Sequence, residues 1–178
     1  MSATSQALKQ AREEVRAGGD RQAIYLKYRD QVSKPLKLAT VIANIPPPSI
    51  PASGRILNIA LLVLLVLGAI LKMFGIVALL GEGVPPTAMF MIVLLGLIIP
   101  VVLIIGVIKW EGQIYALIPI LCGLGILRAW MKSPPLEAAF DTAFLIVIAV
   151  LAFAVKRVVF PQLGWFGVRK NPAGGYHL

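Results

Sequence analysis

The chain has 178 residues, of which 58% are hydrophobic and 14% charged, with a mean hydropathy of +0.86. This composition excludes an ordinary soluble domain, in which about 25% of the residues are charged. The net charge of +9 would suggest nucleic-acid binding in a soluble protein. In a membrane protein it indicates basic segments facing anionic lipid, so we expect no nucleic-acid partner.

The first region, residues 1–45, is a basic tail for which we expect a short amphipathic helical structure. Two helices are predicted, over residues 5–17 and 20–33. Gly18-Gly19 interrupts the helical pattern, and Asp20 has the side chain of an N-cap.

An apolar stripe is predicted on the second of these helices. Ile24, Tyr28 and Val32 recur every four residues and therefore share one helix face. Such a stripe must cover the membrane surface, the chain's own helices or a partner. We treat the three residues as candidate contacts with a partner or with lipid.

Residues 46–55 form a proline-rich spacer. The three consecutive prolines Pro46–Pro48 exclude a helix and favour an extended polyproline II segment. No apolar segment typical of a secretory signal peptide precedes it.

Residues 56–157 contain four long apolar runs, each near the ~20 residues that a helix needs to cross a bilayer. A membrane barrel would need alternating segments of ~10 residues, which are absent. We therefore predict an all-α polytopic membrane protein with four transmembrane helices in two hairpins. The runs cover residues 56–80, 87–108, 113–130 and 136–155.

The distribution of basic residues predicts the orientation. Four crossings place both termini on one side, and that side collects 14 of the 17 Lys and Arg residues. Both termini are thus expected in the cytoplasm, with the protein in a bacterial inner membrane or, as the alternative, an organellar inner membrane.

Charged residues in or beside the apolar runs are candidate site residues. Lys72 lies ~26 Å along the first helix from Arg55, so it either extends to the far headgroups or lines a path for an ion. Glu137 and Asp141 share a helix face and either pair with Arg128 and Lys132 or bind a cation in an aqueous path. The full set is Lys72, Glu82, Arg128, Lys132, Glu137 and Asp141.

Residues 158–178 form a basic and aromatic tail. Frequent Pro and Gly exclude a long helix there. The composition favours contact with lipid headgroups or with a partner. The candidate residues are Trp165, Phe166, Arg169 and Lys170.

Catalytic and metal-binding patterns are absent from the sequence. His177 is the only histidine and Cys122 the only cysteine, which leaves no ligand cluster and no usual general base. We expect no enzymatic activity, no cofactor and no metal.

These features predict a structural or accessory subunit of a larger membrane assembly, such as a secretion, conjugation, energy-converting or transport complex. Its partners would be anionic lipids of the cytoplasmic leaflet and other membrane subunits or copies of itself. One alternative is a homo-oligomeric pore or transport element, including a holin-like one, with Lys72, Glu137 and Asp141 along the path. A second alternative is a membrane-surface adaptor that uses the basic N-terminal helices.

Overall fold

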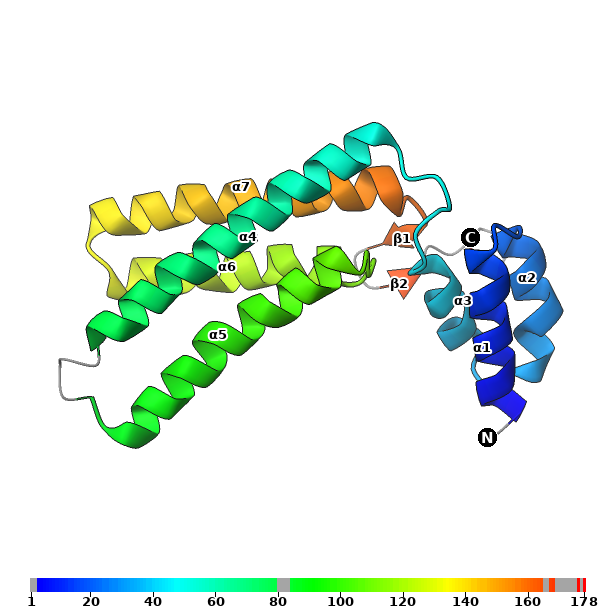
Figure 1. Ribbon diagram of the computed structural model, residues 1–178, viewed down its shortest axis with the longest axis horizontal. Coiled ribbons are helices and arrows are strands. Elements are labelled where there is room, and N and C mark those ends of the chain that lie inside the picture. The colour runs from blue at the N-terminus through cyan, green and yellow to red at the C-terminus, as the bar shows by residue number, and fades with distance from the viewer. Residues whose placement is uncertain (1–2, 80–83, 165–166, 169–175, 177) are drawn as a thin grey trace.

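The structure, a computed structural model, describes residues 3–79, 84–164, 167–168, 176 and 178 (Figure 1). It is 79% helical, which confirms the all-α prediction. Two parts are evident: a small N-terminal helical unit, residues 3–45, and a set of long apolar helices that extends away from it. Both marked chain ends lie at the N-terminal unit.

The N-terminal unit comprises α1 (Ala3–Arg16), α2 (Arg21–Tyr28), the 3-10 turn η1 (Arg29–Gln31) and α3 (Pro35–Ala43). Asp20 caps α2, as predicted, because its carboxylate accepts the N–H groups of Gln22 and Ala23 at 3.3 and 3.2 Å. The helix predicted over 20–33 ends early, and Val32 is already extended. α3 was not predicted; its apolar side chains form the centre of the unit, each 0% exposed: Leu38, Ala39, Ile42 and Ala43.

The break between α1 and α2 is a Schellman motif. Gly18 has a φ of +92°, its N–H donates to Val15 O, and the next N–H donates to Glu14 O. These two bonds satisfy carbonyls at the end of α1, and the positive φ explains the glycine. The interruption of the helix that the sequence predicts at Gly18-Gly19 is therefore confirmed.

Among the described residues, three helices are long and apolar enough to cross a membrane: α4 (Ala52–Leu79), α6 (Ile114–Lys132, apolar to Met131) and α7 (Pro135–Val159). α5 (Pro86–Ile108) has 23 residues, and the apolar stretch described within it is Gly96–Ile108. Only 11% of the apolar window of α4 is buried inside the chain, and 22% of those of α6 and α7. These helices hence present most of their apolar surface outwards.

The apolar helices lie along the long axis of the molecule, with α6 packed on α7 and α4 packed on both α5 and α7. α5 approaches α6 at the end nearest the N-terminal unit and diverges from it farther away (Figure 1). After α7, the short strands β1 (Leu163–Gly164) and β2 (Gly167–Val168) pair antiparallel, and β2 contacts α3. The C-terminal segment thus connects the apolar helices to the N-terminal unit.

Candidate functional site

The most organised polar region is the junction, defined here as the place where α4–α7 meet the N-terminal unit. Tyr115 of α6 donates its hydroxyl to Asn58 Oδ1 of α4 at 2.7 Å, and that hydroxyl is also 3.2 Å from Val107 O of α5. The Asn58 amide nitrogen is 3.4 Å from the same carbonyl. Val107 lies in the last turn of α5, and its carbonyl also accepts the N–H of Trp110. The two side chains meet at this carbonyl and tie three helices together.

The turn from α5 to α6 is a second Schellman motif. Trp110 N–H donates to Val107 O and Glu111 N–H to Gly106 O. Here the residue with positive φ, +54°, is Trp110. A left-handed conformation costs a non-glycine residue about 1–2 kcal/mol, so packing of the partly buried indole on the core must hold this turn.

Close approach at Gly112 joins this turn to the rest of the junction. A Cβ there would stand 2.5 Å from Leu163 Cδ1 and 2.9 Å from Asn44 Oδ1, so a larger residue would require these side chains to shift. Phe160 lies beside it, with its ring 5.7 Å from that of Tyr115. Asn44 Oδ1 is buried and has no hydrogen-bond partner within the described residues.

Two contacts fix the N-terminal unit to the C-terminal segment, and a third lies within the unit at its last residue, Ile45. Gln162 donates its amide to Ala43 O at 3.1 Å, and Arg21 donates to Ile45 O at 2.6 Å. The rings of Tyr25 and Tyr176 meet edge to face at 5.6 Å. Burial lowers the pKa of Arg21 below its usual value and raises that of Tyr25 above its own.

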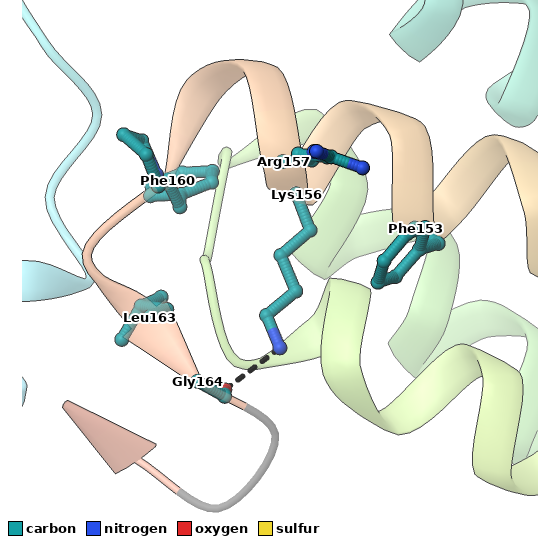
Figure 2. A pocket seen from close by; sticks show the side chains of 7 residues that line it. Phe153, Lys156, Arg157, Phe160, Leu163 and Gly164 are labelled. Atoms are coloured by element: carbon teal, nitrogen blue, oxygen red, sulfur yellow. Dashed lines mark hydrogen bonds between the residues drawn. The ribbon is translucent and has the colours of Figure 1, made fainter. Parts of the chain in front are cut away.

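A cavity of about 460 Å³ opens at the end of α7 (Figure 2). Lys156 is 5% exposed and donates from Nζ to Gly164 O of β1 at 2.7 Å. Figure 2 shows this side chain turned towards Gly164, with Phe153 on one side and Phe160 and Leu163 on the other. The lining is Phe153, Lys156, Arg157, Phe160, Pro161, Leu163 and Gly164, and we call it the Lys156 cavity.

The predicted charged residues are not gathered into a site. Lys72, Arg128, Glu137 and Asp141 are all exposed. Among the described side chains the ion pairs lie in the N-terminal unit, so the predicted network of Arg128 with Glu137 and Asp141 is absent. The bond found there joins Trp130 Nε1 of α6 to Thr142 Oγ1 of α7 at 2.9 Å. The side chain of Lys132, and the whole of Glu82, lie outside the described residues.

The residues predicted to contact a partner or lipid fall into two groups, one in the N-terminal unit and one in the C-terminal tail. Ile24, Tyr28 and Val32 are 5%, 5% and 6% exposed, so the stripe covers the chain's own helices and offers no outward surface. The aromatic and basic candidates of the C-terminal tail, Trp165, Phe166, Arg169 and Lys170, lie outside the described residues.

The sequence did contain a signal for the junction. Asn58 is a polar residue inside an apolar run, and Tyr115 stands at the start of another. Their pairing could not be foreseen, because the two lie 57 positions apart and meet only when α4 and α6 pack.

In chemical terms the described part of the chain holds no group of three metal-ligating side chains. Its buried polar side chains, Asn58 and Lys156, bind backbone carbonyls at helix ends and in β1. Comparison with protein-family models, curated proteins and solved structures gives no match.

Proposed function

We propose that this chain is a structural or accessory subunit of a larger membrane assembly. In this proposal α4 to α7 cross the bilayer four times as two hairpins, and the N-terminal unit lies on the cytoplasmic side. The adaptor alternative loses the stripe of Ile24, Tyr28 and Val32 as a docking surface, because these residues are buried.

The proposal rests on the location of the buried polar side chains. In the described apolar helices, the buried polar side chains are Asn58 and Lys156, which bind Tyr115 and the carbonyls of Val107 and Gly164 near the N-terminal unit. Transport and catalysis within a bilayer use polar groups inside the span. Described spans whose buried polar side chains lie at one end, and whose apolar faces are turned outwards, suit helices that pack against lipid and other subunits.

Length and charge support the proposed topology. At 1.5 Å per residue the 23 residues of α5 extend ~34 Å, enough for the ~30 Å hydrocarbon layer. The ends of α5 and α7 and the start of α4 and α6 lie towards the N-terminal unit (Figure 1). The proposed topology assigns 14 of the 17 basic residues of the sequence to that side, which makes it the expected cytoplasmic side.

Cysteine labelling tests the topology. In a Cys122→Ser background, we expect Val84→Cys and Ser133→Cys to react with an impermeant reagent added to intact cells. We expect Lys34→Cys and Lys109→Cys to react only after permeabilisation. Equal accessibility at Val84→Cys and Lys109→Cys would show that α5 does not cross.

Native mass spectrometry after gentle extraction from the membrane tests the function. We expect co-purification with different subunits at a fixed ratio. A ring of identical copies would contradict the accessory role and favour the pore.

The pore is kept as a second candidate because Lys72, Glu137 and Asp141 are exposed on a single chain. Such charges could line a path only between copies. The pore predicts that Lys72→Met and Asp141→Asn alter ion flux into liposomes. Flux equal to that of the unaltered protein in both variants would reject it.

A further inference from the structure

We propose that the Lys156 cavity is a binding site for one anionic phospholipid, with the phosphate beside Lys156 and Arg157 and an acyl chain along α7. This inference rests on the proposed insertion of α7 in the membrane and is independent of the accessory role.

The charge of the cavity favours an anion. Lys156 and Arg157 both line it, and none of its seven lining residues is acidic. They belong to the last turn of α7, whose free carbonyls carry about half a negative charge. Two full positive charges exceed that half charge, so the site stays cationic.

The position of Lys156 is fixed before any ligand binds. Its 2.7 Å bond to Gly164 O holds the ammonium in the cavity wall, while Arg157 is exposed to the surroundings. A guanidinium binds phosphate oxygens through two parallel N–H bonds, which makes Arg157 the expected direct contact. Lys156 contributes its charge to the wall whatever other contact it makes.

The apolar surface beside the cavity indicates a lipid as the source of the phosphate. Ile146, Val150, Phe153 and Arg157 follow one another at spacings of four, three and four, so they share one face of α7. The three apolar members are 48%, 59% and 40% exposed. This stripe leads from the interior of the proposed span to the cation, as an acyl chain joined to a phosphate requires.

The size of the cavity also suits a lipid headgroup and its glycerol. About 460 Å³ lies within the usual range of ~300–1,000 Å³ for small-molecule sites. Phe153 and Phe160 supply its apolar walls, and together with the two cations they give the mixed lining that a headgroup and its glycerol need.

The test is native mass spectrometry of the full chain in detergent, titrated with phosphatidylglycerol or with phosphatidylcholine of the same acyl chains. We expect one tight phosphatidylglycerol adduct and weaker, non-saturating phosphatidylcholine binding. Arg157→Gln should weaken the phosphatidylglycerol adduct roughly fivefold, the effect of one basic residue at a lipid surface. The matched control is Lys109→Gln, an exposed basic residue at the same end of the molecule but outside the cavity.

A second variant and a competitor distinguish a bound phospholipid from bound free phosphate. Phe153→Ala should weaken phosphatidylglycerol binding without changing Arg157, and near-ultraviolet circular dichroism checks that both variants fold. An excess of inorganic phosphate should leave the adduct in place. Equal losses in Arg157→Gln and Lys109→Gln, or displacement of the lipid by phosphate, would overturn the proposal. Neither result would bear on co-purification with other subunits.

Discussion

The N-terminal unit and the apolar helices use the same aliphatic and aromatic side chains but place them in opposite ways. In the N-terminal unit Leu38 and Ile42 are 0% exposed, whereas Phe74 of α4 and Phe140 of α7 are 70% and 71% exposed. Water drives the first arrangement, because it favours removal of apolar surface. In lipid that force vanishes between helices, and packing and hydrogen bonds take its place.

The two Schellman motifs show the same contrast at the level of the backbone. In the N-terminal unit the positive φ falls on Gly18, which adopts it without strain. At the junction it falls on Trp110, whose indole packs on the core. The unit uses backbone freedom to turn, and the junction uses side-chain packing to hold a strained turn.

The largest expected effect tests the contrast in burial. Leu38→Ala should destabilise the N-terminal unit by about 2–5 kcal/mol, since it removes a fully buried side chain and leaves a cavity. Phe74→Ala, the matched control, removes a larger but exposed side chain and should change stability by less than ~0.5 kcal/mol. Hydrogen exchange of the full chain in detergent measures both. An equal loss in the two variants would mean that the exposed face of α4 is packed.

The next effect concerns the network at the junction. Tyr115→Phe leaves the buried Asn58 Oδ1 without its 2.7 Å donor and should cost about 1–3 kcal/mol in unfolding by denaturing detergent. Because Asn58 and Tyr115 act on one carbonyl, adding Asn58→Leu should cost less than the sum of the two single changes. Strict additivity would show that the three helices are not coupled there.

A smaller effect tests the far end of α6 and α7. Trp130→Phe removes the hydrogen bond to Thr142 and should cost about 0.5–1.5 kcal/mol in the same assay. Asp141→Asn should change little, since no ion pair to Asp141 is found among the described side chains. A larger loss of stability in Asp141→Asn than in Trp130→Phe would support the salt network that the sequence predicts.

Features that depend on neighbours in the chain could be predicted from the sequence. The Asp20 cap, the break at Gly18 and the apolar character of α4, α6 and α7 all follow from local chemistry or from a count of apolar residues. α3 could not be predicted in this way. A helix of nine residues is marginal by itself and exists because Leu38 and Ile42 are buried against α1 and α2.

The sequence did not predict the features that depend on how the helices are rotated against one another. The Asn58–Tyr115 bond and the Lys156 cavity need the packed helices and the C-terminal segment to exist. Arg128 and Lys132 were expected to pair with Glu137 and Asp141. The side chain of Lys132 lies outside the described residues, Arg128 and Asp141 are exposed, and the contact found at this end joins Trp130 to Thr142. The rotation of each helix decides which side chains touch, and the order of residues along the chain does not give that rotation.

The smallest effect lies on the surface of the N-terminal unit, where water weakens ion pairs. Glu14 Oε1 accepts from Lys27 Nζ and from Tyr28 Oη, both at 2.7 Å, and these hydrogen bonds, that of Lys27 first, lower the pKa of Glu14 below its usual 4.5. A lowered pKa means that the contribution to stability is present above pH 4.5 and is lost as the pH falls through the folded value. The hydrogen bond to Glu14 raises the pKa of Lys27 above 10.5, so its contribution is present below pH 10.5 and is lost in base.

Glu14→Gln should therefore slightly reduce the hydrogen-exchange protection of the α1 and α2 amides at neutral pH. It should also make this protection less sensitive to acid. Hydrogen exchange at a series of pH values, corrected for the intrinsic rate, measures this change. Glu13→Gln is the control, because Glu13 is 64% exposed and lies 4.0 Å from Lys9, too far for a hydrogen bond. If both variants keep the acid sensitivity of the unaltered chain, the bonds of Glu14 contribute nothing to the stability of the N-terminal unit.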